Sequence, residues 1–208
     1  VLMTGANIMY ADARDDEGNI TSTPTNRSTL ASASNAYLTA RQVNKAVTAL
    51  KKAKAPTFSG GKYLAVIHPS VAEDLRNDKA WVEAHKYAKP EELYNGEIGE
   101  LHGVRFVETN MAGIVKQGEK AIYLTMFFGK DAFAVIDPEG AGMETIIKDK
   151  GEVGGPLEQF STVGTKFSMA AAILYPERML TVESLSSYSD IDEANCSPVG
   201  PVKEGHNG

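Results

Sequence analysis

Apolar residues at helical spacing mark the first element that the sequence predicts. They recur every three or four positions and share one helix face: Val43, Ala46, Val47 and Leu50. Thr39 and Gln42 have the spacing of a capping box, which places the helix start after Thr39. Three lysines followed by Pro56 place its end, because lysines complement the C-terminal dipole and the residue before proline avoids helical geometry.

Two shorter helices are predicted in the second quarter of the chain. Ser70 and Glu73 form another capping box, and the helix behind them turns three apolar residues inward: Val71, Ala72 and Leu75. The next helix starts at Asp78 and carries three residues on one side: Trp81, Val82 and His85. Core packing is expected for Trp81, since aromatic residues in such a segment pack more often than they bind.

Compact or alternating apolar runs predict strands through the rest of the chain. These strands cover residues 63–68, 104–108, 121–128, 132–137, 143–149, 163–173 and 179–185. Segment 63–68 is continuously apolar, which is typical of a strand buried on both faces. Segment 163–173, which includes Phe167, keeps period two over its whole length. A strand this long can extend past one compact domain.

Polar segments separate and flank these elements. Residues 10–35 are rich in Asp, Ser, Thr and Asn, so we expect an extended or loop-like lead-in. The glycines at 151–155 predict a flexible break. Residues 187–208 have the composition of a loose tail.

Composition narrows the class of protein. The chain has 208 residues, 42% of them apolar and 23% charged, so it can bury a core without metals or disulfides. Its longest apolar run, 169–175, is far short of the roughly 20 residues of a membrane span. The single cysteine, Cys196, excludes an intrachain disulfide. A net charge of -6 with scattered Lys and Arg argues against sequence-specific DNA binding. Lys51, Lys52 and Lys54 could touch a nucleic-acid backbone, although dipole compensation explains them more simply.

The stretch GEIGELHGVRF contains three glycines that resemble a phosphate loop at first sight. The spacing of Gly96, Gly99 and Gly103 misses G-x-G-x-x-G, and the order helix, glycines, strand is not the strand, loop, helix order of a phosphate site. We therefore expect these glycines to shape a tight turn into a strand.

Other chemistry-bearing residues are few. The histidines lack metal-ligand spacing; His68 is expected to be half-buried, and His85 and His102 to lie on the surface. No nucleophile motif is present. The sequence predicts no enzyme and no catalytic, cofactor-binding or metal-binding residue.

A chain of motifs carries a resemblance to a known family. An amphipathic helix ending in lysines is followed by GGKY and a strand ending in HP, then by NGEIG and GVRFVET, and later by FFGKDAFAVID. From Leu38 to Leu185 this order resembles the tailed-phage major capsid proteins of the N-four type, which have the Hong Kong 97-type capsid fold.

The resemblance implies an α+β fold with two domains. A peripheral (P) domain at 38–56 and 143–175 would contain a spine helix and a long β-hairpin, and an axial (A) domain at 57–142 and 176–186 would contain a central sheet flanked by helices. Residues 1–37 would be a lead-in segment. The positions singled out for fold or assembly are Val43, Val47, Leu50, Trp81, Gly96, Gly99, Gly103 and Phe167.

The implied function is structural. The resemblance implies a subunit that forms pentamers and hexamers of an icosahedral shell around double-stranded DNA, which it contacts non-specifically. It also implies a place in the virion after assembly in the host bacterial cytoplasm, with portal, scaffold or decoration proteins as further partners and without cofactor or membrane. The alternatives are an encapsulin-like nanocompartment shell and, from another class, a phosphate-ligand-binding enzyme that uses the glycine loop.

One feature departs from the family. Its members have an N-terminal arm and an extended loop before the spine helix, and the segment before Leu38 is expected to be too short for both. We therefore expect the chain to be a truncated form.

Overall fold

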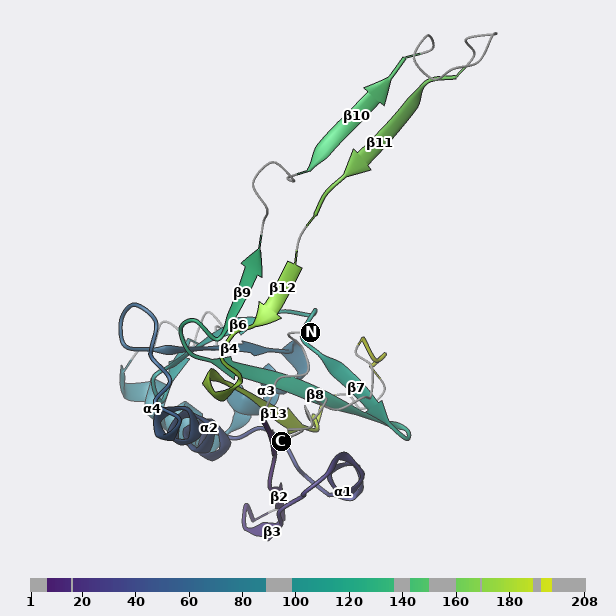
Figure 1. Cartoon of the computed structure of the whole chain (residues 1–208). Coiled ribbons are helices and arrows are strands. Elements are labelled where there is room, and N and C mark those ends of the chain that lie inside the picture. The colour runs from purple at the N-terminus through teal and green to yellow at the C-terminus, as the bar shows by residue number, and fades with distance from the viewer. Residues whose placement is uncertain are drawn as a thin grey trace, which may run out of the picture.

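The computed structural model describes residues 7–15, 17–88, 99–136, 143–149, 160–168, 170–188 and 192–195. A central sheet with helices packed against it forms the body of the molecule, and paired strands project from the body as an arm (Figure 1).

The central sheet has seven strands in the order β1-β13-β8-β4-β6-β5, with β7 also paired to β8. The pairs β1–β13 and β4–β6 are parallel, and the other pairs are antiparallel. The strands are β1 (Asn7–Tyr10), β4 (Tyr63–Ile67), β5 (Glu100–Leu101), β6 (Val104–Glu108), β7 (Ile114–Gln117), β8 (Lys120–Phe128) and β13 (Met179–Ser184).

Four α-helices and three two-stranded sheets complete the described fold. The helices are α1 (Arg27–Ser32), α2 (Ala40–Lys52), α3 (Pro69–Asn77) and α4 (Lys79–Ala88), with a 3-10 turn at Pro176–Arg178. The small sheets pair β2 (Ala13–Arg14) with β3 (Ile20–Ser22), β9 (Phe133–Ile136) with β12 (Ala170–Ile173), and β10 (Glu144–Lys148) with β11 (Thr162–Lys166).

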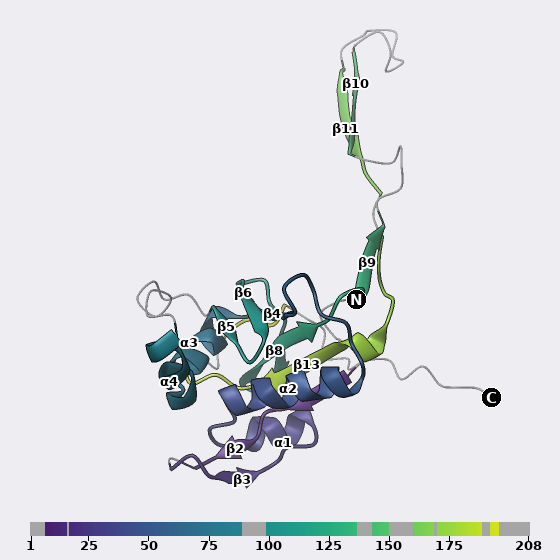
Figure 2. The same ribbon diagram turned by 90° about the vertical axis from the view of Figure 1, so that its left-hand side faces the viewer.

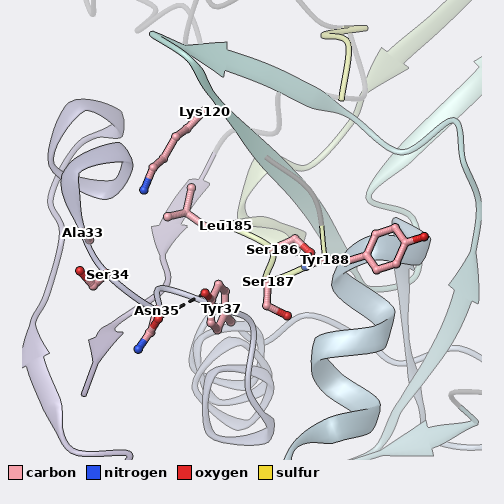
Figure 3. Close-up of a pocket in the computed structure, with 9 residues that line it drawn as sticks. All are labelled: Ala33, Ser34, Asn35, Tyr37, Lys120, Leu185, Ser186, Ser187 and Tyr188. Carbon is pink, nitrogen blue, oxygen red and sulfur yellow. Dashed lines mark hydrogen bonds between the residues drawn. The ribbon is translucent and has the colours of Figure 1, made fainter. Parts of the chain in front are cut away.

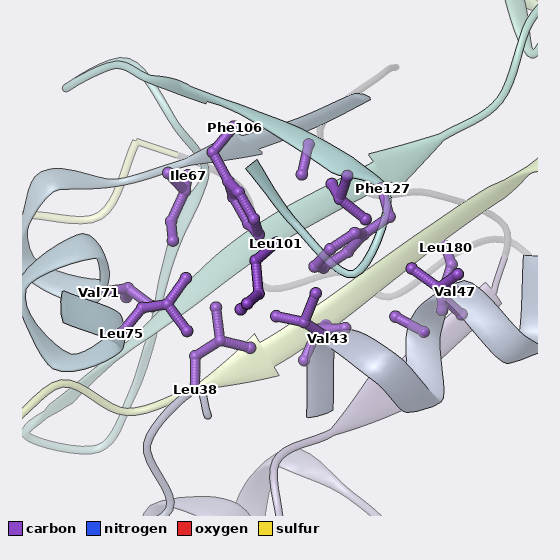
Figure 4. Close-up of a cluster of buried hydrophobic side chains, with 14 of the residues drawn as sticks. Leu38, Val43, Val47, Ile67, Val71, Leu75, Leu101, Phe106, Phe127 and Leu180 are labelled. Carbon is purple, nitrogen blue, oxygen red and sulfur yellow. The ribbon is translucent and has the colours of Figure 1, made fainter. Parts of the chain in front are cut away.

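The main core lies between α2, α3 and one face of the sheet (Figure 4). Side chains of α2 and α3 meet side chains of the sheet there: Val43, Val47, Leu50, Val71, Leu75, Ile67, Phe127 and Leu180. Successive residues of β8 point to opposite faces, so Ile122 and Met126 contribute to two smaller clusters instead. The predicted helices and most predicted strands of the body are therefore confirmed.

The two predicted capping boxes are wrong, although both helices exist. Thr39 is the N-cap of α2 but makes no side-chain cap bond; instead the Ala40 amide donates to the Asp78 carboxylate over 2.7 Å. His68, not Ser70, caps α3, since its Nδ1 accepts from the Ser70 amide over 3.2 Å. Burial lowers the pKa of His68, which favours the neutral ring that can accept this bond.

The predicted loop-like lead-in is also wrong, because the described residues 7–15 and 17–37 contain strands and a helix that contact the body. Strand β1 pairs in parallel with β13, and α1 has a capping box formed by Asn26 and Thr29. Leu30 of α1 is fully buried in a cluster with Ile122 and Leu185. This segment adds an edge strand and a second core cluster to the sheet.

A buried ion pair ties the lead-in to the sheet. Glu183 of β13 is fully buried, and the Arg27 guanidinium donates to its carboxylate through Nε at 2.8 Å and Nη2 at 2.6 Å. Two parallel bonds of this kind satisfy a carboxylate that would otherwise be costly to bury.

The tail is not loose in its described parts. The Asn195 side chain accepts from the Ile114 amide over 2.7 Å and donates to the Ala112 carbonyl over 2.8 Å. Asp192 accepts a hydrogen bond from the Tyr123 hydroxyl. Residues 192–195 therefore dock beside β7 and β8, which corrects the expectation of a loose tail there.

Replacing Arg27 with Met is expected to lower the free energy of unfolding by about 3–5 kcal/mol, because the buried Glu183 loses its partner. The matched control is Arg76→Met, which removes the exposed Arg76–Glu108 pair and should cost at most about 1 kcal/mol. Urea unfolding followed by circular dichroism measures both. Equal losses in the two variants would contradict the role of burial.

Candidate assembly surface

The arm consists of strands β9 to β12 and the described residues beside them (Figure 2). Strand β9 pairs with β12 next to the body, and β10 pairs with β11 farther out. The single long strand predicted for 163–173 is therefore wrong. Its two parts, β11 and β12, pair with different partners, and Phe167 and Ser168 between them lie outside any strand.

The base of the arm is anchored in the body. Phe133 of β9 and Ile173 of β12 pack against a small core cluster that contains Phe128. The rings of Phe128 and Phe133 meet edge to face with centroids 5.3 Å apart. The Leu174 amide also donates to the Ala132 carbonyl over 3.0 Å.

The outer arm has no core of its own. Every residue of β10 and β11 is exposed, and most of the large exposed apolar side chains of the described chain lie on the arm or at its base. They are Val135, Ile136, Met143, Ile146, Ile147, Phe160, Val163, Phe167, Leu174 and Tyr175. A two-stranded ribbon is marginal by itself, and an exposed apolar surface of this kind marks an interaction site.

The predicted positions that carry large side chains separate into two groups. Val43, Val47, Leu50 and Trp81 are buried in the main core, whereas Phe167 is 67% exposed on the arm. The first group supports the fold, and of these five Phe167 is the one that is available to a partner. The exposed side chains of β9 and β10 were missed as candidates because apolar alternation looks the same in a buried strand.

Two of the three predicted glycines lie at a tight hairpin. Leu101 and Val104 are paired across His102 and Gly103, which have φ values of 51° and 79°. Positive φ at both central positions defines a type I′ turn, which glycine adopts without strain. Gly99 precedes β5 with φ 62°. The expected tight turn is confirmed; Gly96, the 151–155 glycines, Cys196 and His206 lie outside the described residues.

A polar cavity of about 340 Å³ lies beside the end of β13 (Figure 3). Its lining is rich in hydroxyl groups, and the Tyr37 hydroxyl donates to Asn35 Oδ1 over 3.2 Å. Lys120 also lines it. Ser187, which lines the cavity, donates hydrogen bonds to the Asp74 carboxylate, and burial raises the pKa of that carboxylate.

The described residues contain neither a cluster of side chains that could hold a metal ion nor a helix that could span a membrane. Within it, no three His, Cys, Asp or Glu side chains come close enough to hold a metal ion. Among the helices described there, none is long and apolar enough to cross a membrane.

Solved phage capsid structures share this architecture. The chain is similar to the capsid of Helicobacter pylori bacteriophage KHP30 (TM-score 0.59, 12% identity, 88% of this chain and 64% of that chain). It is also similar to the capsids of Ralstonia phage GP4 (0.57, 14%, 91% and 54%) and cyanophage P-SCSP1u (0.57, 11%, 88% and 54%). At these identities the likeness shows the fold alone, which is the Hong Kong 97-type capsid fold. The chain spans roughly half to two-thirds of the length of these solved chains.

The family follows from the sequence itself. Residues 2–137 match the model of the phage capsid protein family, so the chain belongs to that family. None of the curated proteins matches the chain. Family membership confirms the prediction of a capsid protein and not an enzyme. The N-four type stays a prediction.

Core and arm positions are expected to respond differently to substitution. Leu50→Ala should cost about 2–5 kcal/mol of unfolding free energy, because Leu50 is 1% exposed and its loss leaves a cavity. Phe167→Ser should change the unfolding free energy by no more than about 0.5 kcal/mol, since this ring is largely exposed. Thermal and urea unfolding of the two variants provide the test. A large loss for Phe167→Ser would show that the arm supports the fold.

Proposed function

We propose that this chain is a major capsid protein subunit that self-assembles into the icosahedral head shell of a tailed double-stranded-DNA phage. The observation that carries the proposal is the arm: a ribbon with exposed apolar side chains on a body that has a complete core. Membership of the phage capsid family makes other copies of the chain the natural partners.

Assembly by this chain would use many modest contacts. One arm offers a small surface, so a single contact stays reversible and errors can be corrected. When a subunit joins a ring, several such contacts form together and their combined strength is much larger than any one of them. Pentamers and hexamers would form in this way in the host bacterial cytoplasm, with portal, scaffold or decoration proteins as further partners.

The two-domain division is proposed as the resemblance implies it, with a P domain at 38–56 and 143–175 and an A domain at 57–142 and 176–186. Strands β10 to β12 of the P domain form most of the arm, which projects away from the body (Figure 1). The spine helix of the P domain would be α2, whose Val43, Val47 and Leu50 pack in the main core with side chains of the sheet. The N-four type is proposed on the motifs GGKY and GVRFVET.

Contact with packaged DNA is proposed to be weak and non-specific. The chain carries a net charge of -6, and an acidic wall repels the phosphate backbone at long range. Such a wall can enclose DNA without binding it tightly.

Self-association is expected to depend on the arm. The chain should form larger species as its concentration rises, seen by sedimentation velocity, and rings or closed shells by negative-stain electron microscopy. Phe167→Ser should raise the concentration needed for association by roughly tenfold or more, because burial of a Phe side chain contributes about 1.5–3 kcal/mol.

The matched control is Met111→Ser, which removes an equally exposed apolar side chain (67%) from the body. This variant should associate like the unmodified chain. Particles whose nucleic acid resists nuclease would identify a DNA-containing shell. A chain that stays monomeric at all concentrations would refute the proposal.

A further inference from the structure

The register of the outer arm gives its two faces different chemistry. Directly opposed residues of an antiparallel pair lie on the same face. One face contains the pairs Thr145–Thr165 and Ile147–Val163, and we call it the neutral face. The other contains Glu144–Lys166, Ile146–Gly164 and Lys148–Thr162, and we call it the charged face. All the charged side chains of β10 and β11 are therefore on one side.

Exposure of the apolar side chains differs in the same way. On the neutral face Ile147 is 66% and Val163 is 70% exposed, whereas Ile146 on the charged face is 40% exposed. Ile146 lies opposite Gly164 and between charged neighbours whose long stems can cover apolar surface. The charged face is thus well solvated, whereas the neutral face exposes the branched side chains Ile147 and Val163 to solvent.

Only the neutral face can be buried at low cost. Its threonines are uncharged, and its Ile and Val gain from leaving water. Burial of the charged face would remove two lysines and a glutamate from water, which costs several kcal/mol per ion unless each is paired again. The centres of protein interfaces are depleted of charged residues for this reason.

We propose that the arm lies on a second copy of this chain with its neutral face, while its charged face remains in water. This inference rests on the proposed function, since a shell subunit has identical copies as neighbours. The inference goes beyond the proposed function by naming the face of β10 and β11 that forms the interface. The exposed side chains of Met143 (78%) and Phe167 (67%) flank the paired strands and extend the apolar surface available to that copy.

Adjacent isoleucines of β10 give a matched test, because they are the same residue type in the same strand and occupy opposite faces. Ile147→Asp should raise the concentration needed for self-association by more than about tenfold, since it places a charge in the interface. Ile146→Asp should change it less than about threefold. Both variants should unfold at the same temperature as the unmodified chain, because neither residue belongs to the core. Sedimentation velocity of the full chain measures association.

A photo-crosslinking amino acid provides a second measurement that introduces no charge. Placed at position 147 it should yield covalent dimers of the chain, and placed at 146 it should yield few.

The outcomes separate this inference from the proposed function. If both aspartate variants lose association equally, the face assignment fails and the arm remains the assembly surface. If only Ile146→Asp loses association, the assignment is reversed and the inference is wrong. If Ile147→Asp instead lowers the unfolding temperature of the monomer, the neutral face is covered within one chain and not by a second copy. An unmodified chain that never associates overturns both.

Discussion

The fold depends on a strand that has no solvent-exposed face. All six residues of β13 are buried, and the strand lies between β1 and β8 in the sheet. Its neighbours lie far apart in the sequence, β1 near the N-terminus and β8 at 120–128, so β13 joins distant segments of the chain into one sheet. Because β13 carries Glu183, this burial also requires a cation, which Arg27 of α1 supplies. The ion pair therefore acts together with the pairing of β1 and the burial of Leu30 to hold the polar lead-in on the sheet.

Local sequence patterns were sufficient to predict a helix or strand wherever the prediction did not depend on which element it packs against. The helix with Val43, Val47 and Leu50 is visible from its helical periodicity, and the strand at 120–128 is visible as a continuous apolar run. The lead-in was not visible in this way. Its contacts combine the short strand β1 with isolated side chains such as Leu30 and Arg27, and a polar composition hides them.

Periodicity also fails to predict strand boundaries where a chain segment changes its partner strand but keeps the same alternation of apolar residues. From Val163 to Ile173 the alternation is unbroken, yet β11 pairs with β10 and β12 pairs with β9. Period two records which side a residue faces and contains no information on the partner strand. For the same reason the sequence could not separate a core strand from an exposed ribbon: Ile147 on the arm precedes Lys148 and Val182 in the core precedes Glu183, yet the two side chains have opposite exposure.

Separation of core and arm resolves a conflict that every self-assembling subunit faces. Apolar surface drives association, but the same surface can destabilise or misdirect a folding monomer. Here the body has a core of its own, and the apolar surface is placed on a thin ribbon anchored by Phe133 and Ile173. Because the charged side chains of β10 and β11 share one face, the other face is the one that favours contact with protein. Such a ribbon can engage a neighbour in one orientation while its charged side keeps the free subunit soluble.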